Sequence, residues 1–257
     1  MQIPREPELC TGAYVTIARL SFTECATGPQ ADIMMHMTDN QFLPEPLPGD
    51  PMPLFARWLD EARARALQPN PDAMVLATTG ADGAPSARIV LCKRLVETAG
   101  YAVFFTNYHS RKGRELVAHP RAAAVFHWDA MQRQVRIEGP VVRSPAQESD
   151  EYFASRALAS RVGAWASDQS QPLASRAALQ AQVTATEKKL GIPHDASVGQ
   201  VPRPPYWGGT RLWIDVIELW VEGPGRIHDR AQWRRDLRPR NEYEFEAGKW
   251  SGTRLNP

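Results

Sequence analysis

The chain has 257 residues, of which 43% are apolar and 23% are charged, a balance typical of a globular protein with a hydrophobic core. Thirty Lys and Arg residues against twenty-nine Asp and Glu residues give a net charge of +1. The overall charge therefore favours neither nucleic acid nor anionic lipid, and any phosphate site must be a local feature.

Cysteine use and hydropathy indicate the compartment. Cys10, Cys25 and Cys92 are far apart and show neither Cys-x-x-Cys nor Cys/His spacing, which argues against a disulfide framework or a metal site. The sequence has no apolar run of about 18 residues and no basic N-terminal segment followed by an apolar stretch. We therefore expect a cytoplasmic protein that binds neither membrane nor nucleic acid.

The N-terminal segment carries no sustained helical or strand period. Residues 1–49 mix isolated apolar residues with Pro, Gly and Thr, and we expect a loosely ordered arm ahead of one folded domain at 50–257. Met34, Met35 and Met37 precede a more ordinary opening sequence. The first thirty-odd residues are therefore expected to be upstream of the true start.

The domain opens with helix signals. Asp50 and Pro51 provide an N-cap and a first helical residue, and apolar residues follow at helical spacing: Leu54, Phe55, Trp58, Leu59 and Ala62. Residues 73–79 and 86–93 then read as strands, joined at 80–83 by a turn whose Asp-Gly pair suits a tight hairpin.

A short helix with an unusual charge pattern lies between the next two predicted strands, 101–107 and 122–128. Ser110 is its predicted N-cap, and Arg111, Lys112 and Arg114 occupy its first turns. Cations at a helix N-terminus oppose the helix dipole unless an anion binds among them. This pattern predicts a phosphate site.

Further strands are predicted at 134–138 and 141–143, helices at 145–166 and 173–190, and a loop at 191–205. The last section reads as a hairpin of strands 212–221 and 226–235 around Gly223-Pro-Gly225. Short antiparallel strands with interposed helices predict a mainly β, α+β fold: a small barrel with helices at its ends.

Three clusters are rich in anion-binding side chains: Arg88 with Lys93, Arg111 with Lys112, and the segment 226–230. On a strand, Arg226, His228 and Arg230 would share one face. Each cluster alone could be a solvated face with exchangeable ion pairs. Together they make anion binding about as plausible as that alternative. Motifs of nucleotide-binding, zinc-protease and serine-hydrolase sites are absent.

Several separated motifs occur in one order along the chain: R-I-V-L-C-K (88–93), F-F-T-N (104–107), S-R-K-G (110–113), R-Q-V (133–135), Y-F-x-S-R (152–156), S-R-V-G-A-W-A-S-D-Q-S (160–170), Y-W-G-G (206–209), R-I-H-D-R (226–230) and R-L-x-P at the end. On these motifs the chain resembles, from about Asp50 to Pro257, the pyridoxamine 5′-phosphate oxidase family. The resemblance implies an antiparallel split β-barrel that binds FMN as a homodimer.

The resemblance further implies the cofactor residues, several of them across the dimer interface. FMN would be surrounded by Arg88, Ile89, Val90, Leu91, Cys92, Lys93, Phe105, Thr106, Arg111, Lys112, Gln134, Gln169, Ser170, Trp220 and Arg230. Cys92 and Phe105 stand where relatives often carry an aliphatic residue and Tyr. Loss of the Tyr hydroxyl would remove one hydrogen bond to the flavin, about 1 kcal/mol.

For the substrate, the resemblance implies a 5′-phosphate pocket of Lys93, Tyr152, Arg156 and Ser160, with Arg226, Ile227 and His228 over the pyridine ring. Arg226 and His228 are the expected catalytic residues, which orient C4′. The implied reaction oxidises pyridoxamine or pyridoxine 5′-phosphate to pyridoxal 5′-phosphate, with O2 as acceptor, yielding H2O2 and, from the amine, ammonia.

Two alternatives stay open. One is an oxidase of the same fold that acts on another ring system, as in phenazine biosynthesis, for which the phosphate pocket would have no purpose. The other is a flavin- or haem-binding split-barrel carrier or sensor without turnover, which would not need the Arg226/His228 pair.

Overall fold

The computed structural model describes residues 42–193 and 196–257, all within one compact unit that spans Asn40–Pro257. The predicted start near Met34 to Met37 lies outside the described residues. Within them, no helix is long and apolar enough to cross a membrane.

Helix α2 (Met52–Arg65) confirms the predicted helix after Asp50, with Pro51 in place of Asp50 at the N-cap position. The Asp50 carboxylate accepts a hydrogen bond from the backbone N–H of Met52 at 2.9 Å, which satisfies one of the free donors of the first turn. The apolar face of α2 packs on the sheet, where the rings of Phe55 and Phe126 meet edge to face at 5.2 Å.

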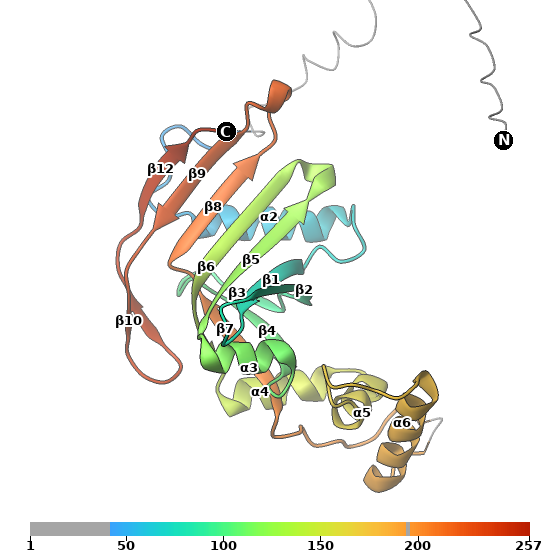
Figure 1. Ribbon diagram of the computed structural model, residues 1–257. Helices are drawn as coiled ribbons and strands as arrows, with labels where there is room; N and C mark the ends of the chain where they lie inside the picture. Colours follow the sequence, from blue (N-terminus) through green and yellow to red (C-terminus); the bar gives the residue numbers. More distant parts are fainter. Residues whose placement is uncertain (1–41, 194–195) are drawn as a thin grey trace, which may run out of the picture. The chain divides into compact units, whose positions relative to one another are not determined.

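Antiparallel strands form a curled sheet in the order β12-β9-β8-β6-β5-β1-β2, and β7, β4 and β3 continue from β6 on the other side (Figure 1). This arrangement confirms the predicted α+β fold class. The strand bounds are β1 (Ala73–Thr79), β2 (Pro85–Leu91), β3 (Arg94–Val96), β4 (Tyr101–Asn107), β5 (Arg121–Trp128), β6 (Arg133–Arg143), β7 (Trp207–Trp213), β8 (Val216–Val221), β9 (Asp229–Arg234) and β12 (Ser251–Leu255). A separate hairpin joins β10 (Leu237–Pro239) to β11 (Phe245–Ala247).

Strand β6 links the two parts of the sheet. The sequence predicted two strands here, whereas one strand runs through Gly139 and Pro140. Along one edge, β6 pairs with β8 up to Glu138 and with β7 from Val141. A Cβ atom at residue 139 would lie 1.7 Å from the carbonyl oxygen of Trp213. Glycine therefore lets β6 pass against the point where β7 ends and the chain turns into β8.

The prediction of one continuous strand over 212–221 was wrong, because two separate strands, β7 and β8, cover this range with a bend between them. Asp215 lies in the bend, where its N–H donates to the carbonyl of Glu138 at 3.0 Å and its own carbonyl accepts from Arg235 N–H at 2.9 Å. These bonds to neighbouring strands hold Asp215 in the bend.

The predicted strand 226–235 begins only at Asp229, so the prediction that Arg226, His228 and Arg230 share a strand face was wrong. Arg226 ends a 3-10 turn, Pro224–Arg226, with a positive φ of 66°, and the N–H of Ile227 donates back to Pro224 O at 3.1 Å. The Gly-Pro-Gly turn thus extends through Ile227, and only Arg230 of the three residues lies in β9.

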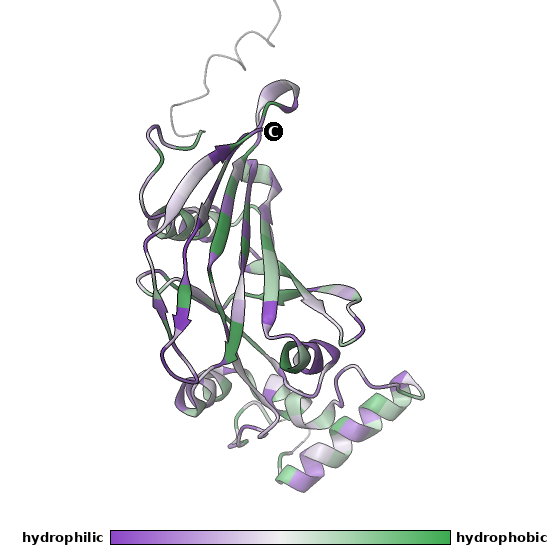
Figure 2. Ribbon diagram, turned by 60° about the vertical axis from the view of Figure 1, so that its left-hand side comes forward, coloured by the Kyte–Doolittle hydropathy of each residue, from purple (hydrophilic) through white to green (hydrophobic). Residues whose placement is uncertain are grey.

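Four further helices surround one end of the sheet: α3 (Arg111–Ala118), α4 (Ala146–Ser155), α5 (Leu158–Ala166) and α6 (Arg176–Leu190). Ser110 caps α3 as predicted, since its hydroxyl accepts from Gly113 N–H at 3.3 Å. The predicted helix 145–166 is interrupted, because Arg156 and Ala157 adopt extended conformations between α4 and α5. Figure 2 shows hydrophobic residues gathered in the strands, while α6 alternates hydrophilic and hydrophobic residues and buries none fully.

The segment before α2 packs on the domain, although the sequence placed it in a loose arm. Leu43 is 4% exposed, and its N–H donates to the Asp229 carboxylate at 2.7 Å. The indole N–H of Trp233 donates to Pro48 O at 2.8 Å. These contacts fix residues 43–48 against β9, and the rest of the expected arm lies outside the described residues.

The glycine of β6 gives a stability prediction. Gly139→Ala should lower the free energy of unfolding by about 2 kcal/mol or more, because the methyl group overlaps a backbone carbonyl that cannot move without breaking strand pairing. Gly49→Ala is the control, since a Cβ atom there has nothing within 4 Å. Urea denaturation measures both, and equal stabilities of the two variants would contradict this role of Gly139.

Candidate active site

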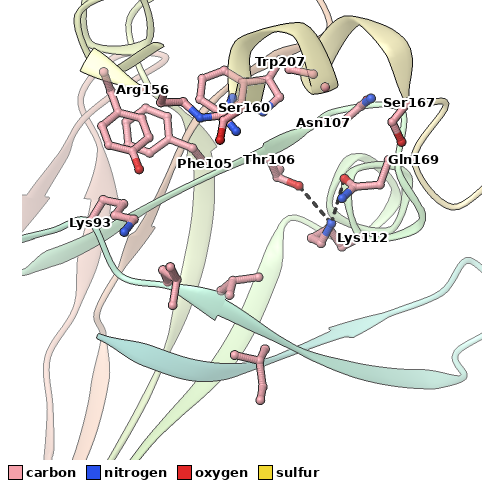
Figure 3. Close-up of a pocket in the computed structure, with 16 residues that line it drawn as sticks. Lys93, Phe105, Thr106, Asn107, Lys112, Arg156, Ser160, Ser167, Gln169 and Trp207 are labelled. Atoms are coloured by element: carbon pink, nitrogen blue, oxygen red, sulfur yellow. Dashed lines mark hydrogen bonds between the residues drawn. The ribbon is translucent and has the colours of Figure 1, made fainter. Parts of the chain in front are cut away.

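A cavity of about 500 Å³ lies where β2 and β4 meet α3, α4 and α5. Many of the predicted cofactor and substrate residues line it: Ile89, Val90, Leu91, Lys93, Phe105, Thr106, Lys112, Tyr152, Arg156, Ser160 and Gln169. Figure 3 shows Lys112 and Gln169 at one end, with Lys93 and Arg156 toward the other. Residues that are distant in sequence thus share a space large enough for a small-molecule ligand.

Lys112 is the charged group at one end of the cavity. Its ammonium donates to Thr106 Oγ1 at 3.0 Å, Ser110 Oγ at 3.2 Å and Gln169 Oε1 at 3.3 Å (Figure 3). Burial lowers the pKa of Lys112 to about 8, and nearby Arg88 adds to this effect. All three donors of this buried ammonium meet neutral acceptors, and such a charge favours an anion that takes the place of one of them.

Arg156 provides cationic character at the other end. Its guanidinium lies over the ring of Trp207, 4.6 Å from the centroid, and its Nη1 is buried with no hydrogen-bond partner in the part of the chain that the structure describes. Burial lowers the pKa of this arginine. Because Arg156 lines the cavity and has no carboxylate partner in the described part of the chain, its guanidinium favours an anion from outside the chain.

Three stacked aromatic side chains line the cavity beside Arg156. The Phe105 ring stacks on Tyr152 with centroids 3.9 Å apart and lies 5.5 Å from the Trp207 ring. Phe105 stands where relatives often carry Tyr, and the loss of the hydroxyl was expected to remove one hydrogen bond to the flavin. In this chain the Phe105 ring packs within the aromatic stack.

Sequence reasoning missed part of the lining: Asn107, Gly163, Ala164, Ser167 and Trp207. Each lies within a motif of the family resemblance, F-F-T-N, S-R-V-G-A-W-A-S-D-Q-S or Y-W-G-G. Trp207 could have been assigned from its motif together with the usual pairing of arginine and indole rings.

Arg88 and Arg111 lie beside the Lys112 end without lining the cavity. Both pair with the buried carboxylate of Glu115, at 3.1 Å and 2.8 Å respectively. Cys92 is fully buried in the core, where burial raises the pKa of its thiol to about 12. Ser170, with a φ of 70°, also does not line the cavity.

A second group of predicted residues lies on β6, β8 and β9. Strand register places Gln134 beside Trp220 and Trp220 beside Arg230, and the His228 ring lies 4.6 Å from the Trp220 ring. Ile227 next to them is 73% exposed. None of these residues, nor Arg226, lines the cavity of its own chain, and the β8–β9 turn lies at the far end of the sheet from α5 (Figure 1).

His228 and Arg230 are held by local contacts. The Nδ1 atom of His228 accepts a hydrogen bond from Gly223 N–H at 3.3 Å, so the proton of the neutral ring is on Nε2. Arg230 forms two hydrogen bonds with the buried Glu218 carboxylate, at 3.0 and 2.8 Å. This pairing fixes the guanidinium beside Trp220.

The lowered pKa of Lys112 predicts how binding of FMN, the cofactor implied by the sequence, depends on pH. The phosphate stays dianionic above pH 7, whereas Lys112 loses its proton near pH 8. The affinity should therefore fall by up to about tenfold between pH 7 and pH 9. Lys112→Met should bind FMN more weakly and lose this decline, whereas Lys188→Met on α6 should behave as wild type. Fluorescence titration tests this, and an unchanged pH profile in Lys112→Met would refute it.

Two family models match the chain. The model described as pyridoxamine 5′-phosphate oxidase covers residues 60–189, and that described as pyridoxine 5′-phosphate oxidase C-terminal dimerisation region covers residues 207–257. Among curated proteins, the pyridoxine/pyridoxamine 5′-phosphate oxidase of Burkholderia lata is 51% identical over 81% of this chain and 89% of its own length. The protein of that name from Thermosynechococcus vestitus is 47% identical over 88% of this chain and 98% of its own length.

Solved structures agree with this assignment. PhzG from Burkholderia lata, solved with tetrahydrophenazine-1-carboxylic acid, superposes with a TM-score of 0.69 at 30% identity, covering 82% of this chain and 94% of its own. A pyridoxamine 5′-phosphate oxidase-related, FMN-binding protein from Nostoc punctiforme has a TM-score of 0.56 at 16% identity over 79% and 95% of the two chains, which supports the fold. The expected family is thereby confirmed: the chain belongs to the pyridoxamine 5′-phosphate oxidase family.

Proposed function

We propose that the chain is an FMN-dependent oxidase that converts pyridoxamine and pyridoxine 5′-phosphates to pyridoxal 5′-phosphate, with O2 as acceptor. The observation that carries this proposal is one cavity with two cationic ends, at Lys112 and at Arg156 with Lys93, and with aromatic rings beside Arg156. Two phosphate-bearing ring compounds in one cavity require such a pair of ends. Membership of the family supports the same reading.

The Lys112 end fits the FMN phosphate. Its ammonium has a lowered pKa and, among the described residues, only neutral acceptors in hydrogen-bond contact, and the N-terminus of α3 lies beside it. In this assignment Lys112, Thr106 and Gln169 hold the phosphate end of FMN, and Ile89, Val90 and Leu91 line the flavin. FMN, when bound, supplies the acceptor for the electrons removed from the substrate.

The Arg156 end fits the substrate phosphate. The guanidinium lies over the ring of Trp207 and lines the cavity, and Lys93, Tyr152 and Ser160 line the same part of it. A dianionic phosphate suits two cations with hydroxyl donors. Binding the phosphate here anchors the ring within the cavity.

The residues on β8 and β9 complete the proposal through a second copy of the chain. The C-terminal family model is a dimerisation region, which supports a homodimer. Since Trp220, His228 and Arg230 do not reach the cavity of their own chain, we assign them to the cavity of the partner. There Arg226 and His228 orient C4′, and His228 offers the proton on Nε2 as a donor.

A second candidate is oxidation of a different ring substrate, favoured by the likeness to PhzG. A phenazine-type substrate carries no phosphate, so it would leave the Arg156 end to a carboxylate or without an anion. A flavin carrier without turnover would use neither Arg156 nor His228.

Turnover of the purified protein separates these candidates. With FMN bound, pyridoxine 5′-phosphate and pyridoxamine 5′-phosphate should yield aldehyde and H2O2, whereas unphosphorylated pyridoxine should react poorly. Bound FMN without turnover of either phosphate would reject the proposed substrate and leave the phenazine-type or carrier reading.

Arg156 gives a sharper prediction within that assay. Arg156→Met should raise KM for pyridoxine 5′-phosphate by roughly tenfold or more, because a charge-assisted hydrogen bond to the phosphate is lost. Unphosphorylated pyridoxine should be turned over as before. Arg176→Met on the exposed start of α6 serves as the control, and an equal loss with both substrates would contradict a phosphate-specific role.

A further inference from the structure

A carboxylate lies buried among the cationic groups next to the Lys112 end of the cavity. Glu115 of α3 is 6% exposed and accepts hydrogen bonds from Thr78 Oγ1 at 2.5 Å and from Ser86 Oγ at 2.8 and 2.9 Å. It also pairs with Arg88 Nη2 at 3.1 Å and with Arg111 Nε at 2.8 Å. An acidic side chain at a proposed phosphate site opposes the binding of an anion, so its presence calls for a physical reason.

The fold places these groups together through three elements. Thr78 in β1 and Ser86 in β2 are direct cross-strand partners, and Arg88 lies two residues further along the same face of β2. Helix α3 packs on β1, and its residues Arg111 and Glu115 are four apart and therefore neighbours on its surface. Arg88 also donates to both hydroxyls, Thr78 Oγ1 and Ser86 Oγ.

The network keeps the carboxylate charged. Burial alone would raise the pKa of Glu115, but hydrogen bonds from Thr78, Arg111, Ser86 and Arg88 outweigh it and lower the pKa to about 2. The negative charge is thus present throughout the pH range in which a phosphate ligand is dianionic.

Without that charge, the corner would contain three cations and a helix N-terminus. Arg88, Arg111 and Lys112 would repel one another, Arg111 would lose its carboxylate partner, and Arg88 would keep only uncharged acceptors when no phosphate is bound. Glu115 neutralises one of the three positive charges, and its ion pairs fix the positions of the Arg88 and Arg111 guanidinium groups. Arg111 keeps most of its surface accessible, with 58% of its side chain exposed.

We propose that Glu115 is a positioning residue for the FMN phosphate: it holds Arg88 and Arg111 next to Lys112 in the arrangement that the phosphate then joins. The inference rests on the proposed FMN site and adds to it a residue that does not itself bind the ligand. Preorganisation of this kind increases affinity because less side-chain freedom is lost on binding.

A comparable carboxylate elsewhere in the chain supplies a matched control. Glu148 of α4 pairs with Arg211 at 2.9 Å and with Arg94 at 3.2 Å, and 12% of its side chain is exposed. It does not line the cavity. Glu148→Gln therefore removes a buried carboxylate with two arginine partners without touching the phosphate corner.

The test compares FMN with riboflavin, which lacks the phosphate, by fluorescence titration of the full chain freed of flavin. Glu115→Gln should weaken FMN binding by roughly tenfold or more, since charge-assisted contacts are lost, while riboflavin affinity stays within about twofold. Glu148→Gln should leave both affinities unchanged. Equal weakening of FMN and riboflavin in Glu115→Gln, or no weakening of FMN, would overturn the proposal.

A second variant covers the case in which Glu115→Gln does not fold. Thr78→Val keeps every charge and nearly the same volume but removes one donor to Glu115, so it should weaken FMN binding severalfold and spare riboflavin. Unchanged FMN binding in Thr78→Val would count against the proposal.

The pH dependence adds a readout that a merely structural role would not change. Glu115 raises the pKa of Lys112, whereas Arg88 lowers it, and the hydrogen-bonded neighbours Thr106, Ser110 and Gln169 are uncharged. Glu115→Gln should therefore move the decline of FMN affinity to lower pH. If the wild type binds FMN and riboflavin with equal affinity, the proposed phosphate site is wrong. If the wild type prefers FMN, and Glu115→Gln keeps the same preference and the same pH profile, the phosphate site stands and only the proposed role of Glu115 is wrong.

Discussion

Strand β6 holds the two parts of the sheet together, and its passage at Gly139 is the constraint on which the site depends. Before Gly139 the strand pairs with β8, and after it with β7. Because β7 in turn pairs with β4, the position of β6 fixes the strand that carries Phe105 and Thr106. Helices α4 and α5 then pack around Trp207 at the start of β7, which closes the cavity from the other side.

The electrostatics of the cavity follow from burial. Lys112 and Arg156 are cations removed from water, and in both cases burial lowers the pKa. Neither has a carboxylate in hydrogen-bond contact within the described part of the chain, whereas Arg88, Arg111 and Arg230 all do. Arg235 is also partly buried, but backbone carbonyls accept from its guanidinium, whereas Lys112 and Arg156 line the cavity, where a ligand can bring the negative charge.

Local signals in the sequence predicted those parts of the fold that depend on neighbouring residues. The Asp50-Pro51 start of α2, the Ser110 cap of α3 and the Asp-Gly hairpin between β1 and β2 are of this kind. Errors arose where tertiary contacts decide. The sequence predicted a break in β6 at Gly139 and Pro140, but both residues pair with β5, so the strand continues. Arg226 was predicted to lie in a strand but adopts a positive φ in a turn.

The site shows the same division. Motifs of the family resemblance located the residues that line the cavity, but composition could not show that Gln134, Trp220 and His228 lie apart from it, since that requires the register of three strands. Glu115 escaped the sequence analysis because an acid near an anion site runs against simple charge matching. Only the hydrogen bonds to its arginine neighbours reveal why it fits there.

A crystal structure of the full chain with FMN and pyridoxal 5′-phosphate tests the central claim most directly. The account predicts the FMN phosphate within hydrogen-bond distance of Lys112 Nζ, the pyridoxal phosphate group on the Arg156 guanidinium, and His228 of the partner subunit beside the pyridine ring. Flavin bound outside the cavity, or both phosphates gathered at one end of it, would contradict the assignment.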